Sequence, residues 1–426
     1  MQLHPIKQLS LTKCNHYEED IFVETSIKNN ITTRAVICGC LLAVLQQGKQ
    51  FIQPALSLIS EAFPNLSITT IQQLISGVAL PTLIGALLAG PLSQYISRKK
   101  LALISSAIIT IGGFGPLLFI DNFNAILALR LFMGLGLGMA SPCAVSIIAT
   151  YVKPDKANKF IGVKESVAAI GSFLATIIAG WLAEITWTAV FYMYLIGVLV
   201  IILVLILLPE DKAAAKIKKS GTVTEKFKPN ALLITALSFA FLYMVFFNSI
   251  GLNIALYMKS TGLGGAAKSG FVSSMVSLGS IVAGFVLAWL VKIFKRGTLG
   301  IGAICLALGF GLLSVAPSID VCLIGAFFIG LGNNICVAQG TYLCTKSTNP
   351  NFYVMTTGLF VAAIHLAQFI TPYVVNPIAE AFSGGMDIYR WKYGFVGAME
   401  LVVGVIAIIA VGYAMKKFEA QESKAS

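Results

Sequence analysis

One short stretch, LQQGKQFIQP, places several polar side chains inside an otherwise apolar segment. Gln46, Gln50 and Gln53 follow one another at the helical spacing i, i+4 and i+7, so they share one face of a helix, and Lys49 lies among them. Such a face is not expected to be turned toward lipid, because charged and amide groups in hydrocarbon are costly unless they have partners. A lysine among glutamines therefore predicts a wet cavity beside this face.

A second cation, Arg130, lies in another apolar segment at a comparable depth. At the rise of a helix, Lys49 lies about 22 Å from the start of its segment, and Arg130 about 10 Å from the start of a segment that runs in the opposite direction. A guanidinium grips a carboxylate or phosphate with two parallel hydrogen bonds, and an ammonium adds a point charge. Lys49 and Arg130 therefore predict an organic-anion site. The alternative is that Lys49 extends to the membrane–water interface and Arg130 braces neighbouring helices.

Neutral hydrogen-bonding groups in two later apolar segments are candidates to complete such a site. Amide and hydroxyl groups inside apolar helices either bind a solute or hydrogen-bond to a neighbouring helix, and the sequence leaves both interpretations open. The candidates are Asn253 and Tyr257 in one segment, with Asn248 nearby, and Asn333 and Asn334 in the other.

Two titratable side chains are candidates to carry a coupling proton. His365 changes charge near physiological pH and has Gln368 close by on its helix, although a lone histidine also occurs as a hydrogen-bonded core residue. Glu165 stands beside Lys164, about two turns from the end of its segment, so a local ion pair is the alternative to a proton relay.

The elements that carry these residues are long and apolar. Of 426 residues, 57% are hydrophobic and 11% charged, whereas soluble domains carry about a quarter charged residues. Runs of about 20 apolar residues recur, enough for a helix to cross a bilayer, and the ten-residue alternation of a membrane β-barrel is absent. The sequence predicts an all-α polytopic membrane protein with twelve spans, near 34–59, 69–95, 99–120, 123–152, 158–185, 187–208, 231–258, 267–293, 298–316, 320–345, 353–380 and 391–415.

The charged residues predict how the spans are oriented. If the spans alternate in direction, nearly all lysines and arginines fall on one side, including the run Arg98–Lys100. Basic loops stay in the cytoplasm, so we expect a multi-pass protein of the cell membrane with both termini inside. The net charge of +12 then reflects topology and contact with the lipid bilayer, and no nucleic-acid partner is expected. The predicted parts are a cytoplasmic arm (1–33), a six-helix bundle (34–208), a cytoplasmic linker (209–230), a second six-helix bundle (231–415) and a cytoplasmic tail (416–426).

The two halves of the chain repeat each other. FMGLGLGM at 132–139 is echoed by FIGLGNNI at 328–335, and a glycine followed eight residues later by a cation occurs at Gly90 and again at Gly284. A Trp-x-x-x-Phe pattern opens the sixth span and also the twelfth. Parallel repeats of this kind are a transporter architecture, in which the solute binds near the membrane midplane between the halves.

These features resemble the major facilitator superfamily, and the resemblance covers residues 34–415. The family's loop signature between spans two and three reads Gly-x-Leu-x-Asp-Arg-x-Gly-Arg-Lys/Arg. Gly90, Leu92, Arg98 and Lys99 match it, whereas Gln94 replaces the acid that latches the two bundles on the cytoplasmic side in the family. Gln94 can hydrogen-bond but cannot form an ion pair, so the resemblance implies a gate without that charge.

Span four is also similar to a family signature, Arg-x-x-x-Gly-x-Gly, through Arg130, Gly134 and Gly136. Span five departs from the antiporter signature, because Ala175 and Thr176 replace its Gly-Pro, which weakens an exchanger interpretation. The resemblance implies that spans one, four, seven and ten line a central cavity and that span twelve, which carries Glu400, is outer scaffold.

The resulting prediction is a secondary active transporter that moves a small organic solute by alternating access, coupled to a proton or another ion, with an organic anion preferred. Proton-driven efflux of lipophilic compounds is an alternative. Aromatic residues and one methionine lie close together at 243–247, and such adaptable surfaces suit promiscuous binding. A non-transporting membrane sensor is another. The sequence shows no metal-ligand spacing, nucleophile motif or ATP-binding loop, so no enzyme, metal or cofactor is predicted, and no obligate protein partner is inferred.

Overall fold

The computed structural model describes residues 31–93, 95–152, 154–210, 229–294, 297–348 and 352–425, and the regular structure in these ranges is helical. Twelve helical segments within the described ranges are long and apolar enough to cross a membrane, which confirms the predicted number of spans. These are Ile31–Ala62, Ile68–Leu92, Arg98–Leu118, Phe123–Tyr151, Lys159–Ile185, Trp187–Leu207, Ala231–Ser260, Ala266–Phe294, Thr298–Val315, Ile319–Lys346, Met355–Phe382 and Ile388–Phe418.

Several spans are made of more than one helix, and their bounds are as follows. The first half contains a helix at 31–46, then η1 (Gln47–Gln50), η2 (Gln53–Ala55), α2 (Leu56–Ala62), α3 (Ile68–Ser76), α4 (Ala79–Leu92), α5 (Arg98–Phe114), η3 (Gly115–Leu118), α6 (Phe123–Tyr151), α7 (Pro154–Ile185), η4 (Trp187–Leu195) and α8 (Ile196–Leu207). The second half contains α9 (Ala231–Phe247), α10 (Ser249–Ser260), α11 (Ala266–Phe294), α12 (Thr298–Val315), α13 (Ile319–Lys346), α14 (Tyr353–Phe382) and α15 (Ile388–Ala425).

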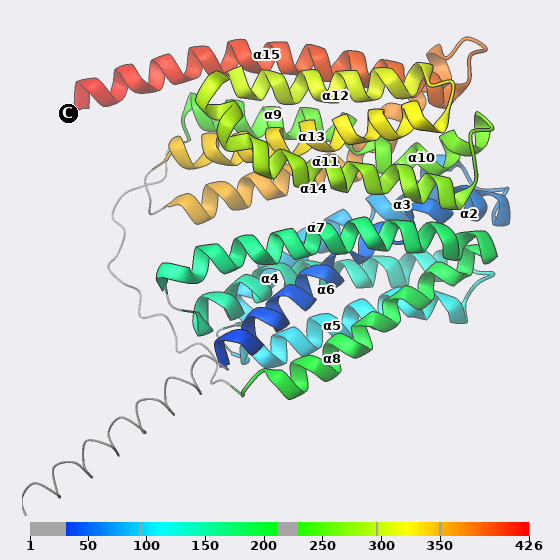
Figure 1. The fold of residues 1–426 in the computed structure, drawn as a ribbon, viewed down its shortest axis with the longest axis horizontal. Helices are drawn as coiled ribbons and strands as arrows, with labels where there is room; N and C mark the ends of the chain where they lie inside the picture. The colour runs from blue at the N-terminus through cyan, green and yellow to red at the C-terminus, as the bar shows by residue number, and fades with distance from the viewer. Residues whose placement is uncertain are drawn as a thin grey trace, which may run out of the picture.

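The helices form two bundles that lie side by side (Figure 1). The buried apolar residues separate in the same way, into one large cluster drawn mainly from the first half and another drawn from the second. We call the end at which α8 ends and α9 begins the linker end, and the opposite end the far end. Figure 1 shows α2, α3 and α10 meeting at the far end, whereas α7 and α14 stand apart at the linker end.

Glycines let paired helices approach closely at matching places in the two bundles. A Cβ at Gly134 in α6 would lie 2.7 Å from the carbonyl oxygen of Val78, and one at Gly330 in α13 would overlap the carbonyl of Val276. Gly138 meets the backbone of Thr82 just as closely. The internal repeat read from the sequence is therefore also a repeat of helix packing, through small residues that admit a neighbouring backbone.

Candidate functional site

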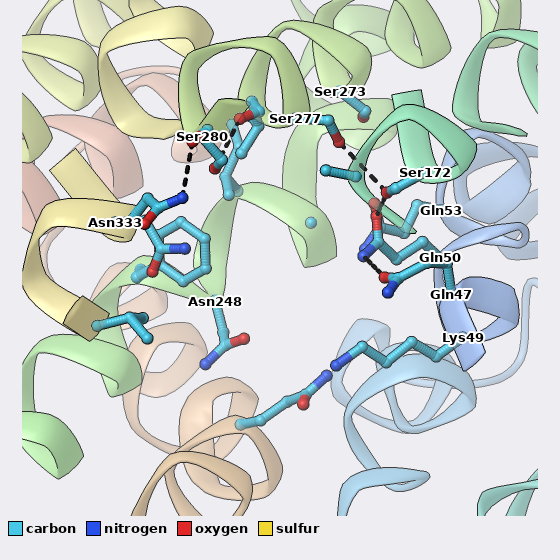
Figure 2. A pocket seen from close by; sticks show the side chains of 18 of the residues that line it. Gln47, Lys49, Gln50, Gln53, Ser172, Asn248, Ser273, Ser277, Ser280 and Asn333 are labelled. Carbon is cyan, nitrogen blue, oxygen red and sulfur yellow. Dashed lines mark hydrogen bonds between the residues drawn. The ribbon is translucent and has the colours of Figure 1, made fainter. Parts of the chain in front are cut away.

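A cavity of about 480 Å³ lies between the two bundles. The first bundle contributes residues of η1, η2, α3 and α7, and the second contributes residues of α9, α10, α11, α13 and α14. Most of its polar groups are amides and hydroxyls, and many of them are visible in Figure 2. The polar lining residues are Gln47, Lys49, Gln50, Gln53, Glu165, Ser172, Asn248, Ser273, Ser277, Ser280, Asn333, Asn334 and Gln368.

Lys49 extends into this cavity from the first bundle, with Asn248 on the opposite side (Figure 2). In the described parts of the chain its ammonium has no carboxylate within ion-pair distance and no hydrogen-bond acceptor. Glu165 lines the same cavity, but it pairs with Lys164 at 2.7 Å and its side chain is 66% exposed. The cavity therefore presents one cation that no described residue neutralises.

A break in span one positions Lys49. The helix changes to 3-10 winding at η1 and again at η2, where Pro54 removes a backbone donor. A 3-10 helix has three residues per turn, so Gln47, Gln50 and Gln53 share a face and line the cavity. Our prediction that Gln46 belongs to this face was based on α-helical spacing, and the structure places Gln47 there instead.

Arg130 does not line the cavity, in contrast to its predicted role as an anion ligand. The side chain is fully buried, donates from Nε to the carbonyl of Leu74 at 3.0 Å, and donates from a terminal nitrogen to the carbonyl of Lys49 at 3.2 Å. It also donates to the hydroxyl of Tyr194, which in turn donates to the carbonyl of Gly48 at 2.6 Å. Arg130 and Tyr194 thus bind the carbonyls of Lys49 and Gly48 within the break, as in the bracing alternative.

This brace predicts that Tyr194→Phe lowers the apparent affinity for the solute without removing any group from the cavity. Losing one buried hydrogen bond should weaken affinity about 2- to 10-fold, because Lys49 is held less firmly. Tyr257→Phe is the matched control, since its hydroxyl donates to the carbonyl of Leu313 at 2.7 Å inside the second bundle. Solute-binding titrations on both purified variants measure the effect, and an equal loss in the two would contradict a positioning role for Tyr194.

The other sequence candidates divide between the cavity and the helix packing. Asn333 and Asn334 line the cavity, and the Asn333 carbonyl oxygen is buried without a described partner. Tyr257 and Asn253 do not line the cavity. Their side chains hydrogen-bond to neighbouring helices, Tyr257 to Leu313 and Asn253 to Gln72. His365 is not among the lining residues, and its Nδ1 is buried without a hydrogen-bond partner in the described structure.

The loop-signature residues lie at the linker end of the first bundle. Arg98 donates to Ser146 at 3.0 Å and Lys99 donates to the carbonyl of Leu205 at 2.8 Å. Gly90 has open space around its Cα, and Leu92 packs against the first core. Gln94 lies outside the described residues. Their role in a gate stays a prediction.

A line of serines escaped the sequence prediction although its signal is present. Ser273, Ser277 and Ser280 recur at i, i+4 and i+7 in α11 and all line the cavity. Ser277 donates to Ser172 at 3.2 Å, and Ser172 donates to Gln50 at 2.8 Å, so hydroxyl and amide groups bridge the two bundles across the cavity. The spacing that singled out the glutamines applies equally to these serines.

A buried chain of polar groups closes the far end. Lys392 donates to Asn376 at 2.8 Å, and Asn376 donates to Gln72 at 2.8 Å and to Thr69 at 2.9 Å. Gln72 in the first bundle then donates to Asn253 in the second at 2.9 Å. Gln72 is fully buried, and Asn376, Asn253 and Lys392 are at most 2% exposed. We call these residues the far-end seam.

An ion pair and a backbone contact reinforce the same end. Lys259 of α10 pairs with Glu61 of α2, and the backbone N–H of Ala267 donates to Glu184 at 3.2 Å. At the other end of the cavity, the exposed side chain of Glu165 marks a route toward the linker end. The structure is thus closed at the far end.

A solute-sized polar chamber between two repeated six-helix bundles, closed at one end, defines a secondary transporter. The chain belongs to the major facilitator superfamily, whose family model matches residues 38–372 and again 247–424. The cis,cis-muconate transport protein of Acinetobacter baylyi is 27% identical over 422 residues, which span 92% of this chain and 97% of that protein. NiaP of Bacillus subtilis is 34% identical over 117 residues, 26% of this chain and 29% of that protein.

Solved structures share the fold. The nucleoside transporter NupG superposes with a TM-score of 0.72 at 12% sequence identity, covering 89% of this chain and 99% of that one. The superfamily consists of transporters, so the prediction that the chain is not an enzyme is confirmed.

Proposed function

We propose that this transporter moves a small organic anion with one carboxylate across the cell membrane by alternating access, coupled to protons, with the linker end in the cytoplasm. The observation that carries the proposal is Lys49, a cation that faces the chamber and has no partner in the described structure. A buried charge without a partner is costly, so a carboxylate that binds beside it gains a charge-assisted hydrogen bond. Arg130 faces away, which leaves one positive charge for the solute.

The opposite wall of the chamber suits the uncharged part of such a solute. Asn248, Asn333 and Asn334 offer amides, while Met244 and Phe247 offer apolar surface. Muconate, named in the description of the A. baylyi relative, carries two carboxylates. The single available lysine and the acidic Glu165 at the chamber's linker side favour a solute with one carboxylate over a dicarboxylate.

Efflux of lipophilic compounds receives less support from the chamber. Of the aromatic and methionine residues at 243–247, Met244 and Phe247 line it, whereas Tyr243 is fully buried on the other side of α9. The remaining walls are dominated by amide and hydroxyl groups.

Counterflow into proteoliposomes with matched solute pairs tests the proposal. Sorbate and muconate share a six-carbon diene chain but carry one and two carboxylates, and benzoate and benzamide differ in charge on the same ring. We expect sorbate and benzoate to exchange, with muconate and benzamide weaker by about tenfold or more, the equivalent of one lost charge-assisted hydrogen bond. Stronger exchange of benzamide would contradict the anion proposal. No exchange of any solute would favour the sensor alternative.

A further inference from the structure

Glu400 occupies a core position in span twelve. The buried face of α15 is formed by Tyr393, Val396, Glu400, Val403 and Ala407, which follow one another at helical spacing. Every other member of this face is apolar or aromatic, and Glu400 is 0% exposed. The resemblance to the superfamily implied that span twelve is outer scaffold, but this carboxyl is turned into the second bundle.

Neither carboxyl oxygen of Glu400 has a hydrogen-bond partner in the described structure. No lysine, arginine or histidine of the described ranges forms an ion pair with it. Burying a carboxylate without a partner costs several kcal/mol, and a neutral acid avoids most of that cost. The geometry therefore requires the protonated form in this conformation.

Two titratable side chains of neighbouring helices lie near Glu400. Tyr243 of α9 and Cys336 of α13 are both fully buried and close enough to interact with it electrostatically, and the Tyr243 hydroxyl also lacks a described partner. From α12, which packs most extensively against α15, Cys305 interacts electrostatically with Cys336. These neighbours are neutral at physiological pH, so none of them compensates a carboxylate.

The helix that carries Glu400 packs against α9, one of the helices that line the chamber. On α9, Met244 and Phe247 line the chamber, while Tyr243 is close enough to Glu400 to interact with it electrostatically. On α13, Asn333 lines the chamber, while Cys336 lies against Gly302 of α12 and interacts with Glu400 only electrostatically. One helix of the chamber wall, α9, therefore also packs against the helix that carries the unpaired acid.

We infer that Glu400 is a proton-binding site of the transport cycle. It holds a proton while α9 and α12 pack against α15 as in this structure, and releases it when those helices move and water reaches the carboxyl. In the release step the O–H bond breaks, the proton passes to water and a carboxylate remains. The inference rests on the proposed function, because it supplies the proton coupling that function needs.

Glu400→Gln tests this site because glutamine has nearly the same shape and cannot release a proton. In proteoliposomes we expect the variant to keep solute counterflow, which needs no net proton movement, and to lose accumulation driven by a pH gradient. A pH dye should show no proton movement with solute. Retained proton-driven accumulation would overturn the inference, as would loss of both activities together, which is the result of a purely structural role.

A second readout does not depend on transport. Infrared difference spectra of the wild type with isotope-labelled glutamate carboxyls should contain a protonated-carboxyl band that is absent from Glu400→Gln. If the spectra of the wild type and Glu400→Gln do not differ in this band, the inference is overturned. If Glu400→Gln folds poorly, Glu400→Asp takes its place, because it keeps a carboxyl and should show the protonated-carboxyl band at a shifted position. If His365→Gln loses proton movement while Glu400→Gln keeps it, the proton is assigned to His365 and the inference is overturned. If no solute exchanges, the proposed function fails while the infrared result still decides the state of Glu400.

Discussion

Lys49→Gln should abolish anion transport at ordinary solute concentrations. The substitution keeps a polar side chain one bond shorter than lysine but removes the one chamber cation that has no described partner. Loss of a hydrogen bond to a charged group corresponds to an affinity about 10- to 100-fold weaker. Sorbate binding and counterflow measured on the purified variant report this loss directly, and Lys49→Arg should retain part of the activity because the charge is kept.

Lys268→Gln is the matched control for charge. Lys268 is an exposed lysine near the far end, and its ammonium donates to the carbonyl of Leu263 at 3.4 Å. Removing it lowers the net charge equally but leaves the chamber intact, so transport should be unchanged. Full transport by Lys49→Gln, or an equal loss in both variants, would contradict an anion site at Lys49.

Gln72→Leu should shift the protein toward a conformation that is open at the far end. Gln72 accepts from Asn376 and donates to Asn253, so leucine would leave both amides buried without these partners. Each unsatisfied group costs about 1–3 kcal/mol in the closed conformation only, which corresponds to a population shift of about 10-fold or more. Spin labels at Asn65 and Ser260, exposed on opposite bundles, should report a longer distance in the variant.

Gln73→Leu is the control for the far-end seam. Gln73 is the neighbouring glutamine, is 8% exposed, and its amide nitrogen has no described hydrogen-bond partner, so its loss breaks no bond between the bundles. The distance distribution of Gln73→Leu should match that of the wild type. A distribution unchanged by Gln72→Leu would show that the seam does not hold the far end closed.

The fold could be predicted because its determinants are local. Span lengths follow from bilayer thickness, and the two-bundle arrangement follows from the repeated glycine motifs, which the structure shows at matching helix contacts such as Gly134 and Gly330. Depth also follows from sequence, since helical rise placed Arg130 at the level of Lys49, whose carbonyl it contacts.

The direction in which a side chain points could not be predicted in the same way. Arg130, Asn253 and Tyr257 lie in the expected spans but face other helices, because rotation about a helix axis is set by packing. The α-helical spacing of the glutamines selected Gln46, since the 3-10 break near Pro54 cannot be seen from hydropathy. The far-end seam depends on residues such as Thr69 and Asn376 that are 307 positions apart, and no local pattern connects them.

The most direct test of the account is the accessibility of a cysteine in the chamber from each side of the membrane. Ser277→Cys, in a background whose native cysteines are replaced, places a thiol on the chamber wall. With an impermeant thiol reagent, we predict labelling from the cytoplasmic side when Gln72 is retained, protection by sorbate, and labelling from the outside once Gln72→Leu is added. Labelling from the outside alone without that substitution, or identical labelling from both sides in every case, would contradict alternating access around this chamber.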